Sequence, residues 1–305
     1  MGEKPLKFLA AVAQIAPVFL NREATIDKAC KIIAEAADGG ARIIAFPEAW
    51  VPTFPYWPRD LPHPNRSLSV DAYVALYREA VEIPSPATER LCAAARQGRI
   101  TVVMGINEKE SRQGGTMYNT LLYIGPSGEI LGRHRKLMPT FEERCVWGMG
   151  GADSLQVYST DCGRLSGLVC GNNLMTLAKY ALLSQGEQIH VAVWPSRTGM
   201  KDMVDVVSRN YAIEGQVFVL CACGYFTADH VPDEFALKPH TEWAIGGGSG
   251  IIDPMGRYLA GPVYDREELI QAEIDLDRII AAKSVHDTTG HYARPDILRL
   301  EIRGQ

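Results

Sequence analysis

The first 46 residues alternate apolar runs with one amphipathic stretch, and this pattern constrains the fold more than any other feature. Residues 7–15 (KFLAAVAQI) and 41–46 (ARIIAF) are nearly continuous apolar runs of strand length. Between them, apolar residues recur at helical spacing over 22–37, and Gly39-Gly40 ends the stretch. A strand, a helix and a second strand in this order predict parallel neighbours joined by a right-handed crossover.

The rest of the chain repeats this rhythm and adds hairpins. Turn sequences such as Gly125-Pro-Ser-Gly128 and Asp253-Pro-Met-Gly256 separate short apolar runs, as is typical of β-hairpins. Further helices are expected over 70–82, 86–97, 174–184, 201–214 and 277–285. Further strands are expected over 100–104, 120–124, 129–133, 155–158, 165–170, 189–194, 217–221, 245–252, 257–260 and 269–275. We predict an α/β protein with a mixed sheet system, as one domain over 1–305 with a short tail at about 297–305.

Composition and charge exclude several classes of partner. The chain has 31 basic and 36 acidic residues, a net charge of −5, which argues against a nucleic acid or an anionic membrane. The N-terminus lacks the apolar stretch of a signal peptide, so we expect a cytoplasmic protein. Seven scattered cysteines, an odd number, indicate reduced thiols rather than a disulfide framework.

Three positions offer chemistry, although each has an ordinary structural alternative. Cys170 ends an apolar run and precedes an expected helix, where free N–H groups favour a thiolate, but it could be a buried structural cysteine. Glu48 follows the run 41–46 through a proline, at a strand exit suited to an active site, but it could be a solvated loop carboxylate. Lys136 could stabilise negative charge or simply end a basic strand.

Other motifs are less specific. Cys221 and Cys223 lie near His230, but no matching second pair completes a zinc site. The run Gly246–Gly250 lacks the Lys-Ser/Thr ending of a phosphate-binding loop. A papain-like dyad is disfavoured because no signature flanks Cys170.

Taken together, the motifs resemble those of the nitrilase superfamily, which are a glutamate, a lysine and a cysteine in that order. The resemblance extends over nearly the whole chain. The matching strings are Phe46-Pro-Glu48, Arg135-Lys136-Leu-Met-Pro-Thr140, Leu168-Val-Cys170, Glu143-Arg-Cys-Val-Trp-Gly148 and Gly290-His-Tyr-Ala-Arg-Pro-Asp296. The last two of these strings resemble the true nitrilase branch of the superfamily.

The resemblance implies a four-layer α-β-β-α sandwich and a nitrile-hydrolysing activity that needs no cofactor or metal. It assigns Cys170 as nucleophile, Glu48 as general base, Lys136 as stabiliser of the tetrahedral species and Glu143 as a second active-site glutamate. By the same resemblance, further residues would bind the substrate or the developing negative charge. They are Phe54, Tyr56, Thr140, Trp147, Gly171 and Trp194.

One departure from the family pattern follows the cysteine. Nitrilases usually have a glutamate two positions after the nucleophile, whereas this chain has Asn172. The alternatives are a superfamily amidase and a non-catalytic binding or assembly protein. The expected partners are a small nitrile and a second copy of the chain, in a homodimer or a higher homo-oligomer. The chain stops nine residues after Asp296, whereas many nitrilases continue further and form spirals, so a dimer is expected rather than long filaments.

Overall fold

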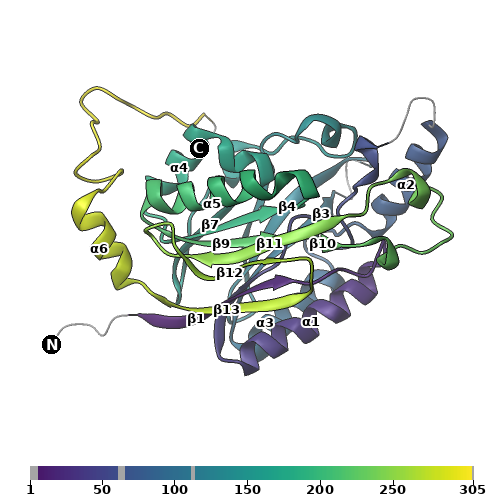
Figure 1. Ribbon diagram of the computed structural model, residues 1–305, viewed down its shortest axis with the longest axis horizontal. Helices are drawn as coiled ribbons and strands as arrows, with labels where there is room; N and C mark the ends of the chain where they lie inside the picture. Colours follow the sequence, from purple (N-terminus) through teal and green to yellow (C-terminus); the bar gives the residue numbers. More distant parts are fainter. Residues whose placement is uncertain (1–5, 61–65, 111–113, 304–305) are drawn as a thin grey trace.

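Two β-sheets stack face to face, and helices cover the outer face of each (Figure 1). This computed structural model describes residues 6–60, 66–110 and 114–303. The expected four-layer α-β-β-α sandwich is confirmed.

The first sheet is built from the N-terminal half of the chain and one late strand. Its strands, in spatial order, are β13 (Glu268–Asp275), β1 (Lys7–Gln14), β2 (Ala41–Ala45), β3 (Thr101–Lys109), β4 (Met117–Ile124) and β5 (Ile130–Arg135). β1, β2 and β3 are parallel, which confirms the predicted crossover, and the other pairs are antiparallel. The helices of this half are α1 (Arg22–Asp38), α2 (Arg66–Glu79) and α3 (Pro86–Gly98).

The second sheet, like the first, has three parallel strands at its centre and antiparallel strands beside them. Its strands, in spatial order, are β10 (Tyr225–Phe226), β11 (Ile245–Ile252), β9 (Phe218–Cys223), β8 (Ile189–Trp194), β7 (Gly163–Val169) and β6 (Tyr158–Thr160), with β12 (Tyr258–Tyr264) on β11. β7, β8 and β9 are parallel. The helices of this half are α4 (Thr176–Leu183), α5 (Lys201–Gly215) and α6 (Asp277–Val285).

The continuous apolar runs are explained by burial on both faces of a strand. In β1, Ala10 and Val12 belong to the large core cluster shared by the two sheets. Ala11 and Ala13 belong to the cluster that contains the apolar faces of α1 and α3. Because successive side chains of a strand point to opposite faces, one apolar run joins two layers of the sandwich.

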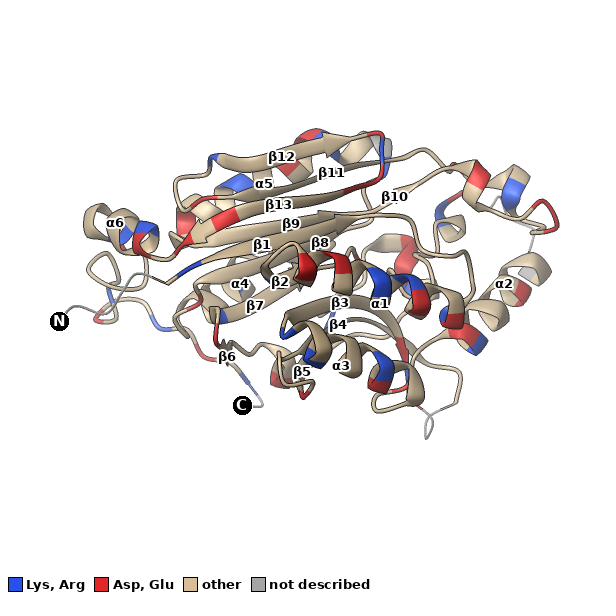
Figure 2. Ribbon diagram, turned by 90° about the horizontal axis from the view of Figure 1, so that it is seen from below, with Lys and Arg blue, Asp and Glu red and all other residues tan. Residues whose placement is uncertain are grey.

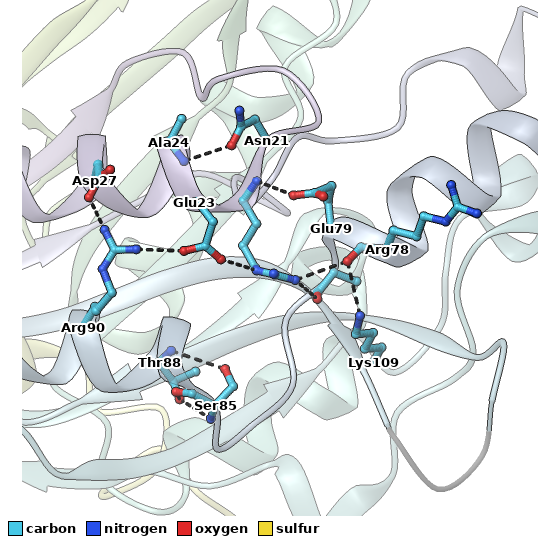
Figure 3. A network of polar contacts seen from close by, with 12 residues as sticks. Asn21, Glu23, Ala24, Asp27, Arg78, Glu79, Ser85, Thr88, Arg90 and Lys109 are labelled. Carbon is cyan, nitrogen blue, oxygen red and sulfur yellow. Dashed lines mark hydrogen bonds and ion pairs between the residues drawn. The ribbon is translucent and has the colours of Figure 1, made fainter.

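Polar contacts fix how α1 and α3 pack (Figure 3). Arg90 on α3 bonds to Glu23 at 2.9 Å and to Asp27, both on α1. The side chain of Ser85 accepts from the backbone of Thr88 and caps the start of α3. Exposed ion pairs contribute only about 0–1 kcal/mol each, so apolar packing provides most of the stability and the polar contacts set the relative orientation.

The charged residues lie mainly outside the sheets. Figure 2 shows basic and acidic residues alternating along α1 and α3, while the strands behind them are almost free of charge. Across the described part of the chain, no helix combines the length and the apolar character of a membrane span.

The elements differ from the sequence-based prediction at a few places. β3 extends to Lys109 instead of ending at 104, because the polar side chains of Asn107 and Glu108 are buried and hydrogen-bonded. β6 covers Tyr158–Thr160, not 155–158, since Leu155 packs into the core instead of pairing with β7. The pattern also gave no sign of β10 or of the short 3₁₀ helices. These are η1 (Trp57–Arg59), η2 (Phe141–Cys145), η3 (Ala152–Ser154), η4 (Cys170–Leu174), η5 (Thr198–Met200), η6 (Ala228–His230) and η7 (Lys238–His240).

Candidate active site

Three of the four residues expected to act in catalysis lie within three residues of the end of a strand of the stacked sheets. Glu48 lies after β2, Lys136 after β5, and Cys170 directly after β7. Glu143 lies in the short helix η2. Carboxyl ends of parallel strands are the usual place for active sites in α/β sheets. The structure brings the side chains together, although 122 positions separate Glu48 from Cys170.

Lys136 joins the two glutamates. Its Nζ lies 2.9 Å from Oε1 of Glu48 and 2.6 Å from Oε2 of Glu143, and its side chain is completely buried. Glu143 is fixed in turn, because the backbone N–H of Thr140 donates to its Oε2 at 2.7 Å. A buried charge needs such partners to persist inside a protein.

The two oxygens of Glu48 differ. Oε1 accepts from Lys136 and from Nδ2 of Asn119, at 2.9 and 2.7 Å. Oε2 is buried and has no hydrogen-bond partner among the described residues. A carboxylate oxygen of Glu48 and the Cys170 sulfur lie within 4.8 Å of one another. The unpartnered oxygen is therefore available to accept a proton.

Cys170 occupies a strained turn. Its φ is +49°, in the left-handed region that residues with a side chain rarely adopt. Such a conformation costs about 1–3 kcal/mol and tends to occur at functional sites. Ala49, Phe141 and Ser196, which lie beside other residues of the site, also have positive φ.

The environment of Glu48 brings its pKa near neutral pH. Burial raises the pKa of Glu48 to about 7, and the neighbouring charge of Glu143 adds to the effect. The ammonium of Lys136 and the hydrogen bond from Asn119 oppose it. A base with a pKa near the working pH is suited to proton transfer.

The pKa values of Lys136 and Cys170 are both raised, but for different reasons. Burial alone would lower the pKa of Lys136, but the acidic groups around it, Cys170, Glu48 and Glu143, outweigh this effect and raise the pKa. Burial and the charge of Glu48 raise the pKa of the Cys170 thiol, against the effects of Lys136 and the N–H of Gly171. The resting pair is thus a thiol and an ammonium, and the thiol needs a base.

The side chains of Glu48, Glu143 and Cys170 could also provide ligands for a metal ion, since one ligand atom from each lies within 4.8 Å of the others. The Lys136 ammonium already bonds to both carboxylates. The positive charge that a metal would bring is therefore supplied by the chain.

A cavity of about 90 Å³ opens beside the Cys170 side chain. Four residues that were expected to bind the substrate line it, namely Phe54, Tyr56, Thr140 and Trp147. Phe54 contacts both Tyr56 and Trp147, with ring centroids 4.8 and 5.3 Å apart. These three rings contribute to the wall together with the charged side chains of Arg59, Glu142, Glu143 and Arg197.

Trp194 and Gly171 do not line this cavity. Trp194 is fully buried in the core cluster shared by the two sheets, so the expectation that it lines the pocket is corrected. The backbone N–H of Gly171 faces the Cys170 sulfur instead. A side chain at Gly171 would begin 3.0 Å from the hydroxyl of Thr140, so the close approach of these segments favours glycine.

Sequence reasoning missed two residues of the site. Asn119 bonds to Glu48 from within β4, and an asparagine inside the apolar run Met117–Ile124 was the available signal. Arg197 lines the cavity, and its guanidinium bonds to Asp60 at 3.1 Å and to the carbonyl of Tyr56. No motif marked it.

Asn172, at the departure from the family pattern, connects the segment of Cys170 with the segment of Lys136. Its Oδ1 accepts from the N–H of Leu137 at 2.7 Å, and its Nδ2 donates to the carbonyl of Met138 at 3.0 Å. Leu137 and Met138 directly follow Lys136, so the amide links the nucleophile turn to the lysine segment. A carboxylate could accept but could not donate.

Comparison with known proteins identifies the family. The profile of the carbon-nitrogen hydrolase family matches residues 9–284. The chain belongs to this family.

Relatives named Nitrilase 2, from an unknown prokaryotic organism, and Nitrilase 1, from Arabidopsis thaliana, are 43% and 38% identical to this carbon-nitrogen hydrolase. Each alignment covers 95% of this chain, with 91% and 85% of the relative. An aliphatic nitrilase of Rhodococcus rhodochrous is 39% identical over 99% of the chain and 84% of its own length. The expected place among the nitrilases is confirmed.

Solved structures support the fold. Nit3 of Saccharomyces cerevisiae, a member of branch 10 of the nitrilase superfamily, superposes with a TM-score of 0.75 at 19% identity. The match covers 94% of this carbon-nitrogen hydrolase and 97% of Nit3. An amidase mutant from Nesterenkonia sp. AN1 matches with a TM-score of 0.66 at 18% identity, covering 91% and 97% of the two chains.

Proposed function

We propose that this enzyme hydrolyses an organic nitrile to a carboxylic acid and ammonia, with Cys170 as nucleophile. The observation that supports this most is the unpartnered Oε2 of Glu48 in a buried cluster with the thiol. The nitrilase relatives, which match nearly the whole chain, favour a nitrile as the substrate.

The first half of the reaction forms a covalent intermediate. Glu48 takes the proton of the Cys170 thiol while the sulfur adds to the nitrile carbon. One C≡N π bond becomes a lone pair on nitrogen, and protonation of that nitrogen gives a thioimidate. Glu48, once protonated, is the nearby source of this proton.

The second half consumes two water molecules. The first water adds to the thioimidate carbon, and the C–N bond breaks as ammonia leaves, which gives a thioester. The second water adds to the thioester, the C–S bond breaks, and the carboxylic acid and the thiol of Cys170 are released. Glu48 or Glu143 accepts the proton of each attacking water.

Lys136 and the N–H of Gly171 stabilise the negative charge that develops during each addition. The ammonium keeps its charge because Glu48 and Glu143 face it, and its buried position limits screening by water. Each preorganised donor of this kind is worth about 3–4 kcal/mol. The chemistry is nucleophilic and acid–base throughout, so we expect no metal or organic cofactor.

The cavity favours compact, apolar nitriles. Its volume of about 90 Å³ is small, since most ligand pockets measure about 300–1,000 Å³. Phe54, Tyr56 and Trp147 form an apolar wall that is suited to an aryl or arylalkyl group.

A panel of nitriles and their matching amides, assayed for ammonia and acid, tests the proposal. We expect ammonia from nitriles, and Cys170→Ala should release none while melting at or above the wild-type temperature. Hydrolysis of the amides alone would show an amidase instead. No turnover of any compound, without a covalent Cys170 adduct in intact-mass spectra, would show a binding or assembly protein.

We also propose that the enzyme acts in the cytoplasm as a homodimer or higher homo-oligomer. Five large apolar side chains exposed on the helices of the second half support an assembly between copies. They are Leu177, Val206, Ile213, Ile280 and Val285.

A further inference from the structure

A chain of buried polar groups runs from the nucleophile turn into the second sheet. Nδ2 of Asn173 donates to the carbonyls of Leu168 and Cys170, at 3.1 and 3.0 Å. Oδ1 of the same amide lies 2.8 Å from Nε2 of His190, on β8. On the other side of the ring, Nδ1 of His190 lies 2.7 Å from Oε1 of Glu187. All of these side chains are buried.

The chemistry of these groups determines which atom donates and which accepts in each hydrogen bond of the network. Because Nδ2 of Asn173 faces two carbonyls, its Oδ1 remains as an acceptor, and Nε2 of His190 must carry a hydrogen and donate it to this oxygen. Glu187 accepts from two hydroxyl groups. The hydroxyl of Tyr211 donates to Oε2 at 2.7 Å, and the hydroxyl of Ser166 donates to Oε1. His190 also stacks on Tyr211, with ring centroids 3.6 Å apart, so its plane is fixed.

The last hydrogen bond of this buried polar network is made to the peptide group between Cys170 and Gly171. The carbonyl of Cys170 and the N–H of Gly171 belong to the same planar trans peptide, so they point in opposite directions. A bond that fixes the carbonyl therefore also aims the N–H, which faces the Cys170 sulfur. The same bond supports the left-handed φ of Cys170, which would otherwise relax.

We propose that His190 is a positioning residue, which acts through Asn173 to aim the Cys170–Gly171 peptide at the reacting atoms. Glu187 holds the ring of His190 in the orientation that this requires. The inference rests on the proposed role of Cys170 as nucleophile. It assigns a function in catalysis to a buried histidine that touches neither the cavity nor the substrate.

Two variants separate positioning from a general structural role. In His190→Gln, the amide nitrogen can take the place of Nε2 and still donate to Asn173. In His190→Asn, the shorter side chain places its nitrogen near Nδ1, so it can reach Glu187 but not Asn173. We expect His190→Asn to lower kcat about 100-fold, as for loss of an oxyanion donor, with little change in KM. His190→Gln should restore most of kcat.

A second measurement does not depend on nitrile turnover. Iodoacetamide alkylates thiols, and peptide mass spectrometry reports the rate at Cys170 separately from that at the exposed Cys145. We expect slower alkylation of Cys170 in His190→Asn than in the wild type or His190→Gln, and equal rates at Cys145 in all three.

His134→Asn is the matched control, because His134 is also a buried histidine, and its Nδ1 contacts Ser154 rather than the nucleophile turn. This variant should melt earlier without losing kcat. Equal kcat and equal Cys170 alkylation in the two His190 variants would overturn the positioning role. If the wild type hydrolyses no nitrile, the proposed function fails, and the alkylation rates still decide the role of His190.

Discussion

The carboxyl group of Glu48 shows how one residue connects stability to activity. Its burial favours the protonated form, yet the proposed reaction needs the ionised form with Oε2 free. Lys136 and Asn119 hold the other oxygen, so the acceptor points in one direction only. The buried position of Glu48 is therefore suited to the proposed proton transfer, although burial makes ionisation of the carboxyl group unfavourable.

The pKa of Glu48 predicts opposite pH dependences for activity and for stability. As pH rises through about 7, the base form of Glu48 accumulates, so kcat/KM should rise and then level off. A carboxyl group whose pKa is raised on folding stabilises the fold fully below its ordinary value of 4.5. That contribution is lost as pH rises through about 7.

Two titrations check this prediction. kcat/KM is measured from about pH 5.5 to about pH 8.5, a range that brackets the raised pKa. Urea unfolding of the wild type and of Glu48→Gln is compared at both ends, and the stability of the variant relative to the wild type should increase with pH. A relative stability that does not change with pH would contradict the assignment.

At the same scale, the family resemblance predicted the cluster but not its surroundings. Glu48, Lys136, Glu143 and Cys170 were assigned together because each lies in a short string that resembles a motif of the family. Trp194 was misplaced, since aromatic residues near motifs are as often core as pocket. Contacts such as those of Asn119 and His190 depend on pairing between distant strands, which no local pattern encodes.

Among the elements, β3 controls where Glu48 lies. A Cβ atom at Gly105 would lie 1.9 Å from the carbonyl oxygen of Pro47 and 2.8 Å from the nitrogen of Ala49. The missing side chain lets the segment of Glu48 pass directly over the strand. Asn107, two residues further along, donates to the carbonyls of Ala49 and Val51 and holds the same segment.

Gly105→Ala should therefore displace Glu48. We expect a kcat about 100-fold lower, because small misplacements of catalytic groups have effects of this size, and a stability loss of about 1–3 kcal/mol. Gly199→Ala is the control, as nothing lies within 4 Å of a Cβ atom there. Kinetics and thermal melts of both variants test this, and an unchanged kcat in Gly105→Ala would refute it.

The turn η4 yields a second prediction through Asn172. In Asn172→Asp, the carboxylate still accepts from Leu137 but faces the carbonyl of Met138 without a proton to donate. We expect a kcat at least about tenfold lower and a stability loss of about 1–3 kcal/mol, as for an unmade buried hydrogen bond. Ammonia release and urea unfolding measure the two effects. Wild-type values for both would mean that the amide is not needed at this position.

Most elements were predictable because their patterns are local. The apolar runs of β1, β2 and β8 and the periodicity of α1 and α5 gave bounds within one or two residues of those observed. β3 was underestimated, since its buried polar residues find partners on other elements. How the sheets stack was not visible in any pattern and came from the family resemblance.

On the scale of the whole molecule, the helices over the second sheet expose large apolar side chains. Figure 1 shows α4 and α5 side by side over the second sheet. Leu177 on α4 and Val206 on α5 are 70% and 63% exposed. Large apolar side chains exposed on the outer helices are typical of interaction sites, and a second copy of the chain is the proposed partner.

Light scattering should give a mass of at least twice that of the chain, whose mass is 33.5 kDa. A double variant, Leu177→Glu with Val206→Glu, should lower this mass, because charges buried in an interface without partners are strongly unfavourable. Val70→Glu is a matched control, since Val70 is exposed on α2, outside this surface. A monomeric wild type would exclude the assembly.

The groups that are proposed to react approach one another where the two sheets meet. Glu48 and Lys136 belong to segments of the first sheet, and Cys170 to a segment of the second. Either half of the chain alone would carry a thiol without a base or a base without a thiol. The rate of ammonia release is therefore proportional to the number of molecules in which both halves are correctly folded. A preparation containing misfolded or proteolytically clipped chains would show a lower specific activity in direct proportion to their fraction.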